Sequence, residues 1–289
     1  GPVVFLWIVF GTIFAGGVHD YLSGMLSERH DGASIGEVVG IYLGEGFRHV
    51  MRVFSVVLLL LLGVVFVAGP ARLIAGLTPE ALDVPFWATC IFIYYILATL
   101  LPIDKLIGGI YPFFGILLLV MAVGISFSLL FGDRPMPELT VAAFANLHSN
   151  ADSFPVFPVM FISVACGAVS GFHSTQSPLM ARCLTNEKLG RRVFYGAMIS
   201  EGIVAMIWAA IGMSFYGGVG ALNEMMTAQK GNAAYLVNEI SNSLLGKFGG
   251  ILALLGVVAA PITSGDTAFR SARLIVADFL KYKQGPIKN

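Results

Sequence analysis

The chain has 289 residues, of which 57% are hydrophobic and 12% are charged, and its formal net charge at pH 7 is zero. An average soluble domain holds roughly 45–50% apolar and about 25% charged residues, so this composition excludes an ordinary soluble domain. The zero net charge removes any general argument for nucleic-acid binding.

Seven long apolar stretches make up most of the chain. Each approaches the roughly 20 residues that a helix needs to cross about 30 Å of hydrocarbon, and a soluble core could not bury seven of them. The sequence therefore predicts an all-α integral membrane protein, a polytopic helical bundle of about seven transmembrane helices in the lipid bilayer. We expect a single domain over residues 1–289. The predicted spans are residues 3–25, 53–76, 85–101, 106–131, 157–180, 193–216 and 248–276.

Lysine and arginine residues fall mainly on alternate connections between the predicted spans. Of the 17, 13 follow odd-numbered spans when Arg270 and Arg273, near the end of the seventh span, are counted as flanking charges. Three follow even-numbered spans, and Arg72 lies within the second span. Positive charge is retained on the cytoplasmic side of a membrane. We therefore expect the N-terminus of this chain outside the cell and its C-terminus in the cytoplasm.

The first span carries an ionisable pair, His19 and Asp20, towards its cytoplasmic end. A histidine beside an aspartate can titrate near neutral pH, which makes the pair a candidate for proton relay or gating. The alternative is structural, because polar pairs at helix ends more often cap the helix or reach towards the interface.

Three connections are longer than simple turns. Ser34 and Glu37 have the spacing of a capping box, which predicts a short interfacial helix over residues 35–43. Two outside connections, residues 133–156 and 217–247, are long enough to act as a lid or gate. The second of these contains an amphipathic pattern that predicts a helix, with one apolar side formed by Ala234, Leu236, Val237, Ile240, Leu244 and Leu245.

The fifth span combines glycine, proline and polar residues in one stretch, residues 166–178. Glycine permits a close approach of a ligand, and Pro178 removes a hydrogen-bond donor from the helix. Small residues also occur where helices simply pack closely, but histidine and glutamine at membrane depth are costly and favour a site. We expect non-helical backbone over residues 171–176. The predicted substrate-binding residues are Gly167, Ser170, Gly171, Phe172, His173, Ser174, Thr175 and Gln176.

The sixth and seventh spans add further polar groups. Glu201 lies about nine residues into the sixth span, where it could pair with a polar neighbour or relay protons. In the seventh span, residues 259–267 contain Pro261 and predict a second helix break, although close packing explains this stretch about equally well. Asp266 is a further candidate for relay or gating, but its spacing from Arg270 also fits an intrahelical ion pair.

At these residues the chain resembles the carbon starvation protein A family of bacterial peptide transporters. The resemblance is carried by residues 6–8, 14–20, 29–37, 161–173 and 266–273, of which the run Ala-Cys-Gly-Ala-Val-Ser-Gly-Phe-His is the most specific. It implies peptide uptake across the bacterial cytoplasmic (inner) membrane during starvation, while some relatives move pyruvate instead. Family members carry further helices before and after this segment, so the chain is expected to be part of a longer protein.

The family is similar to the leucine-transporter-type fold, an inverted five-plus-five repeat. That similarity implies that the seven spans are core helices 2 to 8, and that the broken core helix 6 falls on the fifth span. Core helix 8 would be the seventh span, and in sodium-coupled members this helix donates an Ala-x-x-Thr-Ser set to a cation site. Ala260, Thr263 and Ser264 have that spacing, so they are the predicted coupling-ion ligands.

The predicted function is secondary active transport of small peptides by alternating access. Coupling would be to Na⁺ or H⁺, and neither a cofactor nor a metal centre is expected. The alternatives are a pyruvate-type small-carboxylate symporter and a non-transporting membrane sensor. We do not expect an enzyme, because the sequence contains no nucleotide loop, zinc signature or clustered nucleophile and base. The sequence predicts no oligomeric state.

Overall fold

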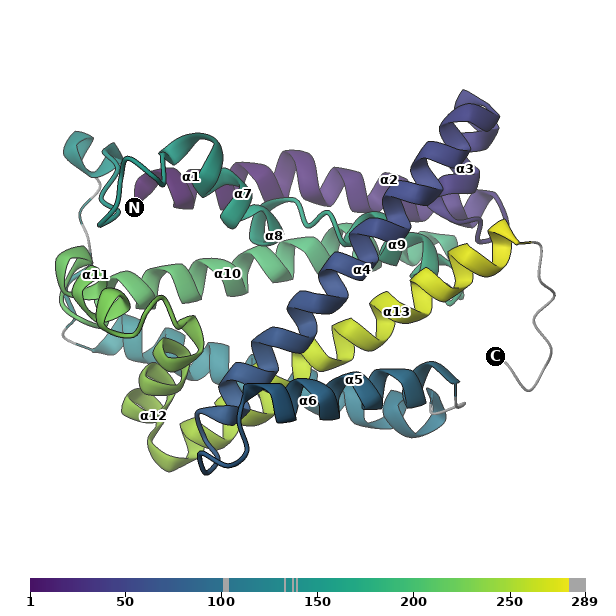
Figure 1. The fold of residues 1–289 in the computed structure, drawn as a ribbon. Coiled ribbons are helices and arrows are strands. Elements are labelled where there is room, and N and C mark those ends of the chain that lie inside the picture. The colour runs from purple at the N-terminus through teal and green to yellow at the C-terminus, as the bar shows by residue number, and fades with distance from the viewer. Residues whose placement is uncertain (101–103, 133, 137, 139, 281–289) are drawn as a thin grey trace. The chain divides into compact units, whose positions relative to one another are not determined.

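A computed structural model describes residues 1–100, 104–132, 134–136, 138 and 140–280 of the chain. These residues form helices and loops, with no strand among them (Figure 1). The α-helices are α1 (Pro2–Phe10), α2 (Gly17–Arg29), α3 (Ile35–Leu43), α4 (Glu45–Ala75), α5 (Val84–Leu100), α6 (Asp104–Phe131), α7 (Phe161–Ser163), α8 (Ala165–Ala168), α9 (His173–Ala181), α10 (Gly196–Ser214), α11 (Val219–Ala228), α12 (Ala233–Leu252) and α13 (Ala259–Phe279). Short 3-10 or π-helical turns are η1 (Gly11–Gly16), η2 (Val141–Phe144), η3 (Val156–Met160), η4 (Glu187–Leu189), η5 (Arg191–Tyr195) and η6 (Ala253–Val258).

Four helices of the described residues are long and apolar enough to cross a membrane: Pro2–Arg29, Glu45–Ala75, Pro112–Phe131 and Glu187–Ser214. A shorter apolar helix, Val84–Ala98, corresponds to the third predicted span. The all-helical membrane class is thus confirmed, whereas the count of seven spans and the leucine-transporter-type fold stay predictions.

The two helices predicted in connections are present. The predicted short helix over residues 35–43 is α3, and the main-chain amides of Glu37 and Val38 donate to the carbonyl of Ser34. The amphipathic segment lies in α12, where Ile240 is fully buried. α12 is kinked at Gly246, whose φ of 61° is readily adopted only by glycine.

The chain gathers into two compact units. The first unit holds Gly1–Val38 and Ile125–Asn232, and the second holds Val39–Gly124 and Ala233–Asn289. The first, fifth and sixth predicted spans therefore belong to the first unit, while the second, third and seventh belong to the second. A single domain over the whole chain stays a prediction.

In the first unit, α9 packs along α2, and α10 packs against α1, α2 and α8 (Figure 1). A side chain at Gly24 would collide with the ring of Phe194, so the absence of a side chain there lets η5 approach α2 closely. Met25, Ala181 and Phe194 are buried against one another at this contact.

In the second unit, α4 and α13 run side by side (Figure 1). Gly63 on α4 leaves room for the ring of Phe269 on α13. Tyr95 on α5 is almost fully buried, and its hydroxyl donates to the carbonyl of Phe66 at 3.1 Å. The hydroxyl of this buried tyrosine therefore has a hydrogen-bond acceptor, although its ring packs among apolar side chains.

The predicted break in the seventh span is wrong, because α13 runs without interruption through residues 259–267. Pro261 is the third residue of α13, and the π-helical turn η6 ends at Val258, just before it. A local π-helical adjustment can satisfy the backbone groups that a proline leaves without partners. The helix therefore accommodates Pro261 without unwinding.

The orientation in the membrane can be tested with cysteine labels at Ser149 and Lys188, which are both exposed. In a variant without the three natural cysteines, we expect an impermeant maleimide to label Ser149→Cys in intact cells. Lys188→Cys should be labelled only after the membrane is opened, because the charge asymmetry places it in the cytoplasm. Labelling of both positions in intact cells would overturn the predicted orientation.

Candidate functional site

The fifth span is broken between α8 and α9, at residues 169–172. The amides of Val169 and Ser170 both donate to the carbonyl of Ala165, and Ser170 adopts a φ of +43°. The amide of His173 then donates to the carbonyl of Ser170 at 2.9 Å, where α9 begins. This turn separates α8 from α9 and places His173 at the first position of α9.

The sequence predicted that the fifth span is broken, but it did not predict correctly which residues are non-helical. Non-helical backbone was predicted over residues 171–176, whereas the structure has it at residues 169–172, and His173 and the three residues after it are helical. Ser170, rather than a neighbouring glycine, takes the left-handed conformation. Ser170 is 1% exposed, so the surrounding packing holds a conformation that its residue type disfavours.

His173 contacts Asp20, which lies on α2. The ring atom Nδ1 is 2.6 Å from Oδ2 of Asp20. The second carboxylate oxygen of Asp20, Oδ1, is 2.9 Å from Nδ1 of His19. An ionised carboxylate only accepts hydrogen bonds, so Asp20 in that state receives an N–H from each of the two imidazoles.

The other ring nitrogen of His173 faces a second carboxylate. Its Nε2 atom is 3.2 Å from Oε2 of Glu201 on α10. Four ionisable side chains therefore form a continuous chain in the order Glu201, His173, Asp20, His19. We call this set the ionisable chain.

The ionisable chain is buried at its centre and more open at its ends. The side chain of Asp20 is 2% exposed and that of His173 is 21% exposed, against 36% for Glu201 and 37% for His19. A neutral imidazole carries a donor on one nitrogen and an acceptor on the other. His173 can therefore take a proton at one ring nitrogen and release one at the other, which is the chemistry of a proton relay.

Small residues and two long-range hydrogen bonds hold the helices of the ionisable chain together. Gly16 lies against the backbone of Ala168, and the hydroxyl of Thr12 donates to the carbonyl of Gly167 at 3.1 Å. The indole of Trp7 donates to the carbonyl of Phe161 at 3.2 Å. These contacts fasten α1 and η1 to α7 and α8, and so fix the start of α9 beside Asp20.

The other residues predicted to bind substrate make mainly local bonds. The hydroxyl of Ser174 donates to the carbonyl of Gly171 at 2.8 Å, and that of Thr175 donates to the carbonyl of Phe172 at 3.0 Å. Nε2 of Gln176 donates to the hydroxyl of Thr175 at 3.3 Å. These side chains stabilise the turn and the start of α9. Substrate contact by them stays a prediction.

The predicted coupling-ion residues lie on α13, in the second unit. The hydroxyl of Thr263 donates to the carbonyl of Ala260 at 2.8 Å, so two of the three predicted ligand groups contact each other. On the same helix, Arg270 donates to Asp266 at 3.4 Å. This is the intrahelical pair that the spacing of these two residues fits. The cation site, including Ser264, stays a prediction.

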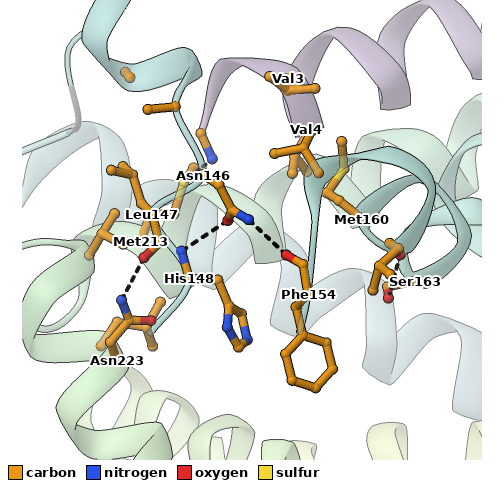
Figure 2. A pocket seen from close by; sticks show the side chains of 17 residues that line it. Val3, Val4, Asn146, Leu147, His148, Phe154, Met160, Ser163, Met213 and Asn223 are labelled. Atoms are coloured by element: carbon orange, nitrogen blue, oxygen red, sulfur yellow. Dashed lines mark hydrogen bonds between the residues drawn. The ribbon is translucent and has the colours of Figure 1, made fainter. Parts of the chain in front are cut away.

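A cavity of about 510 Å³, which the sequence did not predict, lies in the first unit at the start of α1 and the end of α10. Figure 2 shows residues of α1, η3, α10 and the connection before η3 around it. The side-chain amide of Asn223 on α11 donates to the main-chain carbonyl of Leu147. The side-chain amide of Asn146 donates to the main-chain carbonyl of Phe154, and both bonds are 2.7 Å long. These bonds keep residues 145–154 in place at the cavity wall.

The described residues contain no group of three or more His, Cys, Asp or Glu side chains arranged to hold a metal ion.

The family described as carbon starvation protein CstA matches residues 2–72 and 75–209. A membrane protein of Haemophilus influenzae, named only as uncharacterized, is 42% identical over 275 residues, which cover 79% of this chain and 74% of that protein. No solved structure matches the chain.

Two further relatives have functional names. The peptide transporter CstA of Campylobacter jejuni is 26% identical over 264 residues, covering 70% of this chain and 37% of that protein. The pyruvate/proton symporter BtsT of Escherichia coli is 24% identical over 263 residues, covering 70% of this chain and 36% of that protein. The chain therefore spans little more than a third of the length of these named transporters.

Proposed function

Because the chain belongs to the carbon starvation protein CstA family, we propose that it is part of a secondary transporter that imports short peptides into bacteria. Transport is driven by the proton gradient across the cytoplasmic membrane. The ionisable chain Glu201–His173–Asp20–His19 is the coupling element, and its geometry is the observation that carries the proposal. Ionisable groups at membrane depth are costly, which favours a functional role for them.

The arrangement of the four side chains supports protons as the coupling ion. Asp20 is buried between two imidazoles, and His173 connects it to Glu201 on another helix. A proton taken up by Glu201 can reach Asp20 through the two nitrogens of His173. Protonation of Asp20 weakens the charge-assisted contact that holds α9 against α2, because such contacts are stronger than neutral ones.

Alternating access requires two bodies that move against each other. The division of the chain into two compact units supports this mechanism, since the ionisable chain lies wholly in the first unit. We propose that the first unit contains the mobile bundle and that the second unit belongs to the scaffold.

A small-carboxylate symporter is the second candidate, favoured by the relative named as a pyruvate/proton symporter. The two ring nitrogens of His173 each face a carboxylate, that of Asp20 and that of Glu201. Acidic groups suit the ammonium group of a peptide better than a substrate that is itself an anion. This difference favours peptides.

The test is uptake by the full-length protein in liposomes, with labelled Ala-Ala or labelled pyruvate under separate proton and sodium gradients. We expect Ala-Ala to accumulate when the outside is acidic, whether or not sodium is present. Accumulation of pyruvate alone would support the second candidate. Binding without accumulation of either solute would support a sensor and overturn the proposal.

The alternative of sodium coupling makes a different prediction for α13. If protons are the coupling ion, Thr263→Ala with Ser264→Ala should change proton-driven Ala-Ala uptake by less than about fivefold, since the loss of a locally bonded hydroxyl costs roughly 1 kcal/mol. If Na⁺ binds there, the double variant should lose sodium-dependent uptake, because hard cations need oxygen ligands. Initial rates under the two gradients decide between them.

A further inference from the structure

A π-helical turn interrupts the first span shortly before Asp20. This turn, η1, lies between α1 and α2, and at its end the amide of Gly17 donates to the carbonyl of Thr12, five residues earlier. A regular α-helix would bond the amide of Gly17 to the carbonyl of Ile13, four residues earlier. η1 therefore holds one residue more than the α-helical turn that would fill the same place.

The extra residue determines which way Asp20 points. Each residue of an α-helix turns the chain by about 100°, and side chains extend about 5–6 Å from the helix axis. If η1 closed into regular α-helix, the residues after it would rotate by about 100° relative to α1, and the carboxylate of Asp20 would move by about 8 Å. The 2.6 Å contact between Asp20 and His173 would then be lost. The ionisable chain therefore depends on η1.

The hydroxyl of Tyr195 donates to a carbonyl of η1. Where bonds of five-residue spacing give way to bonds of four-residue spacing, one carbonyl is passed over by the amides of its own helix. The carbonyl that follows Thr12 is that of Ile13, and the hydroxyl of Tyr195 donates to it at 2.9 Å. In a regular helix the amide of Gly17 would take this carbonyl. Because a carbonyl without a partner is costly inside a membrane, the bond from Tyr195 stabilises the π-helical form.

The ring of Tyr195 packs on the backbone of the same segment. A Cβ atom at Gly17 would lie 2.8 Å from Cε2 and 2.9 Å from Cδ2 of Tyr195, so the absence of a side chain lets the ring lie this close. Tyr195 is the last residue of η5, directly before α10, which carries Glu201. One side chain thus joins the segment before Asp20 to the segment before Glu201. These are the two carboxylates that His173 connects.

We propose that Tyr195 is a positioning residue for proton transfer: its hydroxyl holds η1 in the π-helical form, in which Asp20 faces His173. The inference rests on the proposed function and deepens it, because it names what keeps the proton-transfer groups aligned. Tyr195 acts through η1 and carries no proton itself. The alternative is a purely structural bond, since a tyrosine hydroxyl in an apolar region commonly bonds to an acceptor.

Tyr195→Phe removes the hydroxyl and keeps the ring on Gly17. The net contribution of one hydrogen bond corresponds to a change of roughly twofold to tenfold in an equilibrium. The initial rate of proton-driven Ala-Ala uptake by the full-length protein in liposomes should therefore fall about fivefold, while exchange at equal pH is unchanged. Tyr95→Phe is the matched control, because it removes a hydroxyl that donates to the carbonyl of Phe66 at 3.1 Å in the second unit. Equal uptake by the two variants would overturn the proposal.

Deletion of Ala15, an exposed residue of η1, separates positioning from packing. With one residue fewer, the bond from Gly17 to Thr12 spans four residues, so η1 becomes regular α-helix while Asp20 keeps its direction. Tyr195 then has no π-helical turn to hold, and Tyr195→Phe should cause no further loss of proton-driven uptake. A purely structural bond would cost the same factor with or without Ala15. The same fivefold loss in both backgrounds would therefore overturn the positioning role.

NMR of isotope-labelled histidine tests the proposal without transport, and also decides if the deletion variant does not fold. The signals of His173 in the full-length protein in detergent are identified by their absence in His173→Gln. They should shift in Tyr195→Phe, because the ring loses its close contact with Asp20, and stay unchanged in Tyr95→Phe. Unchanged His173 signals in Tyr195→Phe would overturn the positioning role. Shifted signals in a natural protein that takes up no Ala-Ala would support the positioning role and overturn only the proposed transport.

Discussion

Asp20→Asn is expected to lower proton-driven accumulation of Ala-Ala in liposomes by about a hundredfold or more. The asparagine side chain keeps the shape of Asp20 and can still accept a hydrogen bond from His173, but it cannot take up or release a proton. Loss of a positioned proton-transfer group typically costs 10²–10⁴ in rate. Exchange of labelled for unlabelled Ala-Ala across the membrane at equal pH should remain, since exchange needs no net proton movement.

Two comparisons decide what a loss in this variant means. Asp152→Asn, in the exposed connection between η2 and η3, removes the same charge outside the ionisable chain and should leave both accumulation and exchange unchanged. Loss of exchange together with accumulation in Asp20→Asn would assign Asp20 to packing rather than to coupling. Normal accumulation in this variant would refute the role of Asp20 as a proton carrier.

The membrane class and the approximate helix positions could be predicted from the sequence because hydrophobicity is a local property. Spans such as residues 3–25 and 53–76 correspond to Pro2–Arg29 and Glu45–Ala75. The details at the two suspected helix breaks could not be predicted in the same way. Ser170 adopts a left-handed conformation beside a glycine that is better suited to it, and η6 accommodates Pro261. Both outcomes depend on neighbours that a local pattern does not contain.

Each member of the ionisable chain could be singled out from the sequence, since ionisable residues in apolar spans are rare and costly. Their connection could not be predicted. Asp20 and His173 are 153 residues apart, and they meet only because α9 packs along α2. The cavity could not be predicted for the same reason, because its lining residues come from segments that are far apart in the sequence.

The site should also depend strongly on Gly16, which lies one turn before Asp20 in the first span. A Cβ atom at this position would lie 2.6 Å from the carbonyl oxygen of Ala168 and 3.1 Å from Cα of Val169. Both atoms belong to the backbone, which cannot rotate away as a flexible side chain would. An added methyl group must therefore push η1 away from the end of α8, where the turn that positions His173 begins.

Two effects of Gly16→Ala oppose each other. Alanine is better than glycine in a helix by roughly 1 kcal/mol, whereas overpacking of a closely packed contact costs typically 1–3 kcal/mol. We expect the overpacking to dominate, because Gly16 is buried and the clash involves backbone. The variant should unfold at a lower temperature than the natural protein. It should also lose most proton-driven Ala-Ala uptake, since the 2.6 Å contact between His173 and Asp20 would lengthen.

Gly212→Ala is the matched control, because Gly212 lies within α10 and an added Cβ there would meet no other atom within 4 Å. Only the gain in helix propensity applies at that position, so the control should be as stable as the natural protein or slightly more stable. Thermal unfolding of the full-length protein in detergent and uptake in liposomes measure the two consequences. If Gly16→Ala matched Gly212→Ala in both measurements, then the close contact between η1 and α8 would not be what holds His173 beside Asp20.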